Sequence, residues 1–230
     1  MRLLSGDEIE HLYRKHVHIH DTAEYSRRYS RLPINENNRE WRWEGKDVAR
    51  VIAVLEFARI CSLHQLTAKH LLTFNGEGDP ELEHLRYERH SNFNYTDGPV
   101  DYDLQTLRIP RHAYDFVMLN QTLEHVYHPL LCLENVRDFL APGAYIYANV
   151  PTVNIPHSTP FHYYTGFTPT GLACLLRACE FEVIEVGQWG NAEYIGRMFK
   201  TQSWPDFRQL RSYAGDFNNP VIAWVLARKD

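Results

Sequence analysis

YDFVMLNQTLEHVYHPLLCLENVRDFLAPGAYIYANVP, residues 114–151, is the stretch that decides the fold. It begins and ends with nearly continuous apolar runs, at 114–120 and 144–151, which are typical of strands buried on both faces of a sheet. Between these runs Pro129 suits the first position of a helix, and the APG sequence at 141–143 ends that helix. A strand, a helix and a second strand in this order predict an α/β sheet.

Signals of the same kind continue on both sides of this stretch. HLLTFN at 70–75 predicts the first strand, and the runs 181–189 and 221–229 predict two more. Thr168 and Pro169 suit the start of another helix, because a threonine can cap it and a proline can begin it. We therefore expect a doubly wound, mostly parallel sheet with helices on both faces.

The two remaining parts of the chain differ from this alternating pattern. Residues 1–66 lack strand alternation and contain a helical apolar face within GKDVARVIAVLEFARI, so they predict an N-terminal helical cap or lid. Residues 67–230 form the sheet domain in this interpretation. Within them, the aromatic segment 191–220 is expected to be an insertion that caps the sheet before the last strand.

The overall composition excludes several classes of protein. The 230 residues are 44% hydrophobic, carry a formal net charge of -5 and show no basic stripe suited to a phosphate backbone. The four cysteines form no CxxC pair, which favours a reducing compartment. The chain starts without a signal-peptide pattern, and no apolar run approaches the length of a membrane helix. We expect a cytoplasmic protein that binds neither nucleic acid nor membranes.

LLTFNGEGDPEL at 71–82 places a two-glycine turn after the first strand, where wound sheets bind ligands. Glu81 stands where a dinucleotide loop would have its third glycine, and no phosphate-loop lysine follows. The carboxylates of Glu77 and Asp79 would each repel a pyrophosphate by about 1 kcal/mol or more. A cationic ligand without phosphate, such as S-adenosylmethionine, is compatible with this turn. The alternative is a tight strand-to-helix connection that binds nothing.

Residues 114–151 also resemble the small class I S-adenosylmethionine-dependent methyltransferases. In that family an aromatic-Asp pair begins the fourth strand, LEHV-x-x-P follows it, and L-x-PGG precedes the fifth strand. The residues at those places here are Asp115, Glu124, His125, Pro129, Pro142 and Gly143. HSTPFHYYTGFTPTGLACLLRACEFEVIEVGQWG, which contains an H-x-x-P-x-H loop, is similar to the family as well. The resemblance implies a seven-stranded Rossmann-like sheet and methyl transfer from S-adenosylmethionine.

The resemblance further implies which residues hold the cofactor. DYDLQTL looks like the family's D-x-x-x-L after the third strand, so Asp103 is expected near the adenine amino group, and Asp97 is the candidate for the ribose hydroxyls. The expected cofactor residues are Asn75, Gly76, Glu77, Gly78, Asp97, Asp103, Leu104, Asn120 and Gln121. The sequence departs from the family's first motif at Phe74 and Pro80.

Three histidines, His125, His157 and His162, follow strand ends on the expected ligand side. Methyl transfer mainly needs alignment and exclusion of water, but a neutral histidine can take the proton of a hydroxyl acceptor. All three are therefore candidate catalytic bases. The alternative is that His125 caps a helix and that the other two bind loop backbone.

HVHIHD at 16–21 places His16, His18 and His20 at alternate positions, which share one face if the segment is extended. Metal sites usually need ligands from elsewhere too, and 13 histidines make local clusters common. We therefore expect a solvated helix or loop face here and no metal site.

Three functions remain open from the sequence. The preferred one is methyl transfer from S-adenosylmethionine to an oxygen or nitrogen of a small molecule, sugar or lipid-linked metabolite. The alternative is a catalytically degenerate methyltransferase-fold module that binds or regulates a partner. A nicotinamide-dependent oxidoreductase is the third, and Glu81 and the acidic turn disfavour it.

Overall fold

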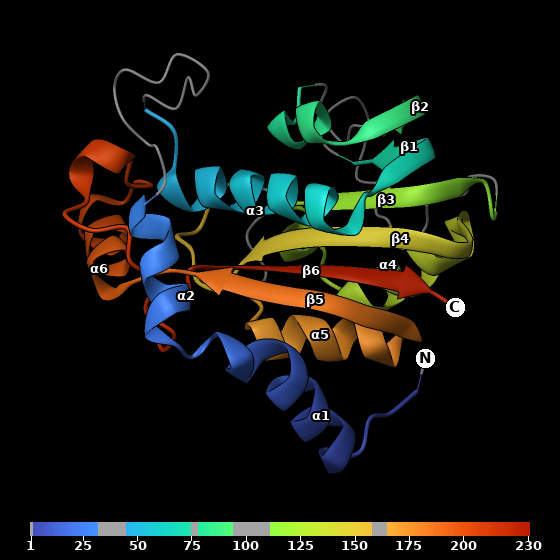
Figure 1. Cartoon of the computed structure of the whole chain (residues 1–230), viewed down its shortest axis with the longest axis horizontal. Helices are drawn as coiled ribbons and strands as arrows, with labels where there is room; N and C mark the ends of the chain where they lie inside the picture. Colours follow the sequence, from blue (N-terminus) through green and yellow to red (C-terminus); the bar gives the residue numbers. More distant parts are fainter. Residues whose placement is uncertain (1, 32–44, 75–77, 94–110, 158–164) are drawn as a thin grey trace.

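A computed structural model describes residues 2–31, 45–74, 78–93, 111–157 and 165–230. It has an α/β architecture in which helices cover both faces of one sheet (Figure 1). The α-helices are α1 (Gly6–Leu12), α2 (Ala23–Arg28), α3 (Val48–His64), α4 (Pro129–Phe139), α5 (Pro169–Ala178) and α6 (Ala192–Thr201). The strands are β1 (Thr67–Thr73), β2 (Arg86–Asn92), β3 (Tyr114–Asn120), β4 (Leu140–Pro151), β5 (Phe181–Trp189) and β6 (Ile222–Lys229). The short helical turns are η1 (Tyr13–Val17), η2 (His18–His20), η3 (Tyr29–Arg31), η4 (Pro80–His84), η7 (Leu123–His125) and η8 (Phe207–Gln209).

The strands of the described residues form a single sheet in the order β2-β1-β3-β4-β6-β5. The neighbours β2, β1, β3 and β4 run parallel, whereas β6 runs antiparallel to both β4 and β5. Because β2 is added on one side of β1 and β3 on the other, the winding reverses between β1 and β3. The expectation of a doubly wound, mostly parallel α/β sheet is confirmed. Six strands lie in the described residues, and the expected seventh is not among them.

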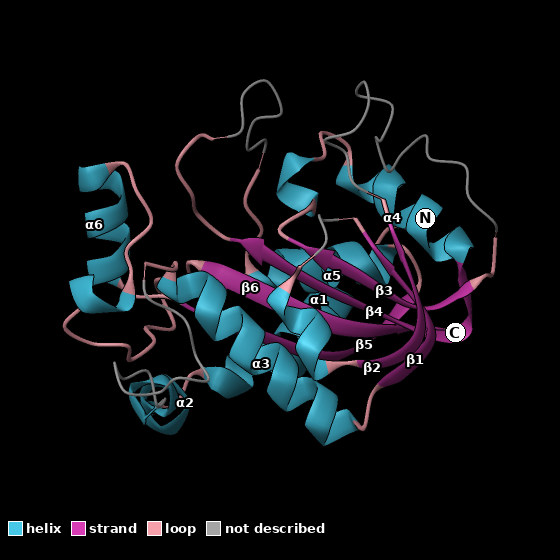
Figure 2. Ribbon diagram, turned by 90° about the horizontal axis from the view of Figure 1, so that it is seen from above, coloured by secondary structure: helices cyan, strands magenta, loops and turns pink. Residues whose placement is uncertain are grey.

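Alternating side chains of the strands build two hydrophobic layers. In β3, Phe116 and Met118 pack in the layer under α3, while Val117 and Leu119 pack in the layer that includes α4 and α5. Figure 2, seen from above, shows α3 lying across the strands. A parallel strand buried on both faces has no polar side, which explains its continuous apolar sequence.

The N-terminal helices contribute to both layers. α1 contacts α5 and η1 contacts β5, while α3 covers the opposite face of the sheet (Figure 1). α3 contributes the fully buried Ile52, Phe57 and Ile60 to the core. It therefore forms one of the helix layers of the sheet. A boundary between a cap of residues 1–66 and a domain of residues 67–230 stays a prediction.

Residues 191–220 include α6 and η8. α6 lies beside the ends at which β4 and β5 finish, on the left in Figure 1. Its Tyr194 and Met198 are buried in the core layer that α3 also joins. Pro205 accepts a backbone hydrogen bond from Val48 at 3.1 Å, which links this segment to the start of α3.

One sequence expectation about local structure is wrong. The helix expected after the glycine turn is a single 3-10 turn, Pro80–His84, because β2 already begins at Arg86. The histidine-rich segment has a π-helical turn at Tyr13–Val17 and a 3-10 turn at His18–His20, so it lacks the extended conformation that a shared face of alternate histidines requires. Its imidazoles therefore do not share one face.

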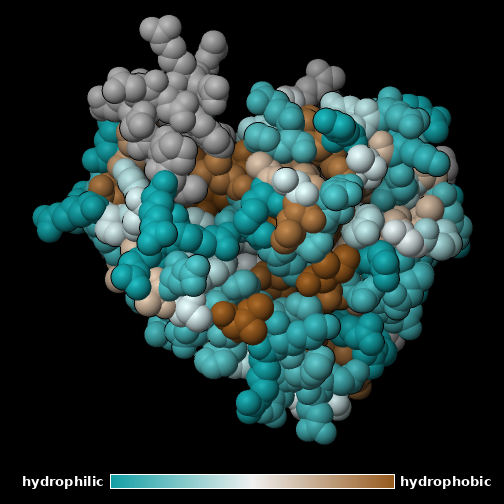
Figure 3. Space-filling view, viewed as in Figure 1, coloured by the Kyte–Doolittle hydropathy of each residue, from teal (hydrophilic) through white to brown (hydrophobic). Residues whose placement is uncertain are grey.

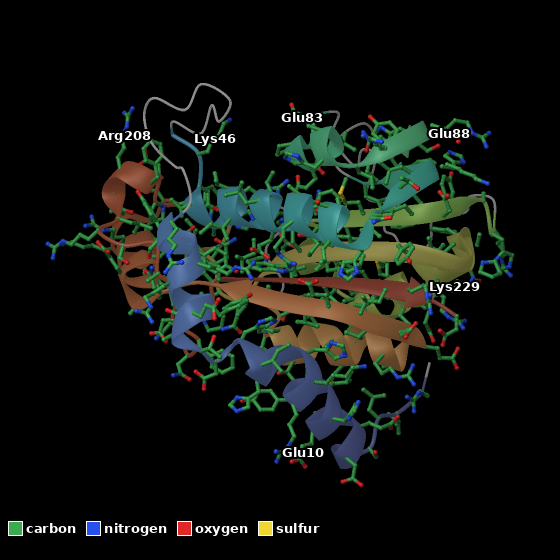
Figure 4. The ribbon with its side chains drawn as sticks, in the orientation of Figure 1. Glu10, Lys46, Glu83, Glu88, Arg208 and Lys229 are labelled. Atoms are coloured by element: carbon green, nitrogen blue, oxygen red, sulfur yellow. The ribbon has the colours of Figure 1, made fainter. Side chains whose placement is uncertain are left out.

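Most charged side chains lie on the outside, and Lys229 is the exception among those labelled in Figure 4. It is 6% exposed, and its Nζ donates to the carbonyl oxygens of Arg137 and Leu140, both at 2.7 Å. These carbonyls belong to the carboxyl end of α4 and the start of β4, where the negative end of the helix dipole also attracts a cation. Lys229 thereby ties the last strand to α4.

The surface seen in Figure 3 is mostly hydrophilic, with several separate apolar patches. No described helix combines the length and hydrophobicity needed to cross a membrane. All four cysteines are free, and Cys61, Cys132 and Cys179 are buried, as expected for thiols that pack as small apolar groups.

Candidate functional site

The carboxyl ends of β1, β3 and β4 form the edge at which wound sheets bind ligands. The winding reverses between β1 and β3, so the crevice beyond these two strands is the favoured position. Polar residues gather there from three places in the sequence. They are Asp79 and Glu81 after β1, Asn120 at the end of β3, and Asn149 in β4.

Arg50 of α3 lies at the centre of this group. Its guanidinium donates to both carboxylate oxygens of Glu81, with Nη2 2.6 Å from Oε2, and to Asp79 Oδ1 at 3.1 Å. Glu81 is completely buried, so the two-point ion pair offsets the cost of removing its carboxylate from water. Burial opposes the charge of Arg50, but the attraction and hydrogen bonds of Glu81 outweigh it and raise the pKa of Arg50.

Amide side chains extend this network across the strand ends. Asn120 Nδ2 donates to Asp79 Oδ2 at 2.9 Å, and Asn149 Nδ2 donates to Asn120 Oδ1 at 2.6 Å. Gln121 Nε2 donates to Asn149 Oδ1 at 2.7 Å. Gln121 also has a φ of 48°, in the left-handed region that non-glycine residues seldom occupy. Such strain is found preferentially at ligand sites.

A cavity of about 190 Å³ adjoins this network. Its walls come from the start of α3, the segments that follow β3 and β4, the segment from α6 to Trp204, and the start of β6. Chain segments distant in sequence thus meet at one end of the sheet. Acidic and imidazole groups line the cavity together with the apolar side chains of Met198, Val221 and Ile222.

Glu124 of η7 is the most deeply buried acid that lines this cavity, with 1% of the residue exposed. Its Oε2 has no hydrogen-bond partner in the described part of the chain, and its Oε1 lies 4.0 Å from His125 Nε2. Burial raises the pKa of Glu124 to about 8, against the opposing effects of a backbone hydrogen bond and of the charge of Arg50. The carboxyl group is therefore mostly protonated at neutral pH.

Asp47 provides a second carboxyl group at the cavity. Its Oδ1 accepts a hydrogen bond from Ala49 N at 3.0 Å, as the N-cap of α3, and another from the Tyr194 hydroxyl at 2.5 Å. Burial raises the pKa of Asp47 to about 6, although the Tyr194 hydroxyl and the backbone donors lower it. Since Tyr194 belongs to α6, this contact connects the two segments that flank the cavity.

A row of three rings forms part of the wall. The rings of His125 and His157 are perpendicular with centroids 4.9 Å apart, and His157 meets Trp204 in the same way at 5.3 Å. The Trp204 indole N–H donates to Asn154 Oδ1 at 2.7 Å, which fixes its orientation. His157 Nδ1 lies 2.8 Å from the Ile155 carbonyl oxygen, which can only accept, so Nδ1 carries the hydrogen. In the neutral ring Nε2 is then the nitrogen that can take a proton.

The structure brings three of the residues expected from sequence, Gln121, His125 and His157, to this cavity. Asn120 is completely buried in the adjoining network, and Gly78 has a φ of 106° in the turn after β1. Asp79, whose carboxylate is compatible with a cationic ligand, pairs with Arg50. The other candidates lie outside the described residues, and these are Asn75, Gly76, Glu77, Asp97, Asp103, Leu104 and His162.

Sequence reasoning missed the contributions of α3 and of the segment after β5. Asp47 directly precedes the helical run of residues 48–64, which is an N-cap signal, but nothing in the sequence places it beside Tyr194. Arg50 and Trp204 have no sequence signal that identifies their partners. Glu124 was visible as part of a motif, whereas its unpaired oxygen was not.

The histidine-rich segment shows three different environments. His16 is buried, and desolvation lowers its pKa to about 4. His20 Nε2 lies 2.7 Å from the carbonyl oxygen of Val186, while His18 is exposed and stacks on Tyr13. In the described ranges, no group of three or more His, Cys, Asp or Glu is arranged to hold a metal ion.

A larger cavity of about 350 Å³ lies between residues 20–26 and 215–218, at the end of β5. Among the described strands β5 lies at one edge of the sheet, so this cavity is remote from the reversal between β1 and β3. Its polar side chains bond to the protein itself: Gln188 Nε2 donates to Phe217 O at 2.8 Å and the Tyr25 hydroxyl to Gln188 O at 3.2 Å. The smaller cavity is therefore the candidate functional site, because it lies closer to the strand reversal and contains a buried carboxyl oxygen that no described residue binds.

Similarity to known proteins points to one family. A comparison with curated proteins finds no match. Among solved structures, 1,6-didemethyltoxoflavin-N1-methyltransferase from Burkholderia thailandensis is 16% identical, with 100% of this chain and 92% of that chain covered and a TM-score of 0.52. A methyltransferase from Archaeoglobus fulgidus is 16% identical, with 78% and 94% covered and a TM-score of 0.49. A possible histamine N-methyltransferase from Thermotoga maritima is 13% identical, with 79% and 92% covered and a TM-score of 0.49.

The match to the Burkholderia methyltransferase establishes similarity of fold alone. The model of the methyltransferase domain family, however, matches residues 22–200, which is well over half of the chain. The matched range contains the reversal between β1 and β3 and most of the cavity wall. The chain therefore belongs to the methyltransferase domain family.

Proposed function

We propose that this protein transfers a methyl group from S-adenosylmethionine to an oxygen or nitrogen atom of a small molecule, sugar or lipid-linked metabolite. The observation that carries the proposal is the cavity beside the end of β3, where a buried carboxyl group and two imidazoles converge. The Burkholderia methyltransferase, whose structure contains S-adenosylhomocysteine and 1,6-didemethyltoxoflavin, supports the same use of this fold.

The charges at this edge of the sheet fit a cationic cofactor. Four carboxyl groups, those of Asp47, Asp79, Glu81 and Glu124, surround the single guanidinium of Arg50 in the described residues of the site. Even with Glu124 protonated, negative charge exceeds positive charge there. Such a surplus attracts the sulfonium and ammonium groups of S-adenosylmethionine and repels a pyrophosphate.

We expect the turn after β1 and the end of β3 to hold the cofactor. The residues proposed for this role are Asn75, Gly76, Glu77, Gly78, Asp97, Asp103, Leu104, Asn120 and Gln121. The side chain of Asn120 already bonds Asp79 and Asn149, so its role would be to shape the edge. When bound, S-adenosylmethionine supplies a methyl group that its sulfonium has already activated.

The protein's own task is then to align the acceptor, exclude water and receive a proton. His157 suits proton transfer, because the bond of Nδ1 to Ile155 O leaves Nε2 as the accepting nitrogen. His125 lies next to it, with its ring 4.9 Å away. His162 remains a third candidate base in this proposal.

Isothermal titration calorimetry with S-adenosylmethionine and S-adenosylhomocysteine tests the proposal directly. We expect dissociation constants below about 1 mM for both compounds, and no heat from NADH under the same conditions. Binding of neither adenosyl compound would contradict the proposal and favour the binding-module alternative. Binding of NADH instead would favour an oxidoreductase.

A further inference from the structure

The buried oxygen of Glu124 needs an explanation. Oε2 is shielded from solvent and accepts no hydrogen bond from the described residues, although Glu124 lines the cavity. Buried polar atoms are almost always hydrogen-bonded, because an unpaired one lowers the stability of the fold. An exception on the wall of a cavity indicates that the partner is a molecule that enters the cavity.

The size and walls of the cavity restrict that molecule. A volume of about 190 Å³ is slightly larger than the cavity of about 150 Å³ that holds a benzene molecule in an engineered protein core. The rings of His125, His157 and Trp204 line it, together with the apolar side chains of Met198 and Ile222. Aromatic rings pack favourably against such walls in edge-to-face or offset arrangements. A single ring is therefore the best occupant.

The polar groups define the ring's substituent. Because Glu124 lines the cavity, an N–H or O–H group on that ring is the kind of donor that would give Oε2 the hydrogen bond that it lacks. A neutral carboxyl group can accept from such a donor through one oxygen and donate through the other, whereas a methyl ether offers no hydrogen to it.

We propose that Glu124 selects the methyl acceptor, and that this acceptor is a single-ring aromatic or heteroaromatic compound whose N–H or O–H donates to the Glu124 carboxyl group. The proposal rests on the proposed function, since it names the substrate class of that site. Glu124 would be a specificity-determining residue, in addition to the histidines considered as bases.

Phenol and aniline are suitable probes, with toluene and anisole as ring compounds that lack the donor. Binding to the full chain can be measured by saturation-transfer NMR titration. We expect phenol and aniline to bind with dissociation constants of about 1 mM, as compounds of this size allow, and about tenfold more tightly than toluene or anisole. Equal affinity for phenol and toluene, or no binding of phenol and aniline, would overturn the proposal.

Variants separate recognition from general effects. Glu124→Leu should abolish the tenfold preference while retaining toluene binding, and Glu124→Gln should restore part of the preference because its amide oxygen accepts a hydrogen bond. Glu83→Gln, which alters an exposed carboxylate of η4 outside the cavity, is the matched control and should keep the full preference. An unchanged preference in Glu124→Leu, with a native circular dichroism spectrum, would refute the assignment.

Calorimetry with S-adenosylmethionine on the same samples distinguishes the two proposals. Cofactor binding without a preference for phenol over toluene would overturn the role of Glu124 in acceptor selection and leave the proposed function standing. A preference that depends on Glu124, without cofactor binding, would support the ring site and contradict methyl transfer.

Discussion

Replacing Glu124 with glutamine should make the protein more stable at neutral pH. The folded protein holds this carboxyl group with a pKa of about 8, against 4.5 for an exposed glutamate, because burial disfavours its charge. The unfolded chain ionises first as the pH rises, so the native state binds more protons and its stability falls between these two values. At pH 7 the cost reaches about 3 kcal/mol, and above pH 8 it approaches about 5 kcal/mol. The glutamine variant does not titrate and escapes this cost.

Urea unfolding at several pH values between 4.5 and 8 measures the effect. The two proteins should have similar free energies of unfolding near pH 4.5, and the variant should gain increasingly over the wild type as the pH rises. Glu83→Gln serves as the control for loss of an exposed carboxylate. A constant difference across this range, or a variant that is less stable at pH 8, would refute the reasoning that burial holds Glu124 protonated.

Two further substitutions test the contacts that hold the edge of the sheet and its far end. Arg50→Met should destabilise the protein by about 3 to 5 kcal/mol, because it leaves the buried carboxylate of Glu81 without its cation. Urea unfolding should show this loss of stability. A double variant that also carries Glu81→Gln should recover much of the lost stability. Lys229→Met should cost about 1 to 3 kcal/mol, because the carbonyl groups of Arg137 and Leu140 lose their buried donor. Thermal unfolding should show the second effect, and an unchanged midpoint would mean that water replaces the ammonium group.

The helix and strand signals near the centre of the chain were sufficient to predict the fold. Pro129 begins α4 and Thr168 caps α5, with its hydroxyl accepting from Gly171 N at 3.1 Å, as the residue types indicate. Capping depends on bonds within a few residues, so it can be read from a short sequence. The same holds for β3, because a strand buried on both faces must be apolar along its length.

β2 gave no comparable signal. Its residues Arg86–Asn92 are polar and largely exposed, and in the described part of the chain it pairs only with β1. A strand with little burial need not show apolar alternation. Its position became clear only through its pairing with β1.

The sequence by itself determined the order of the central strands and helices and the wound α/β sheet, because these follow from local propensity and apolar periodicity. Only the tertiary structure decided the chemistry at the carboxyl ends of β1, β3 and β4. Arg50 reaches Glu81, Tyr194 reaches Asp47, and Trp204 joins the wall of the cavity across long separations in the chain. Whether a buried carboxyl group such as that of Glu124 is hydrogen-bonded depends on which distant residues pack around it. No local sequence pattern records that packing.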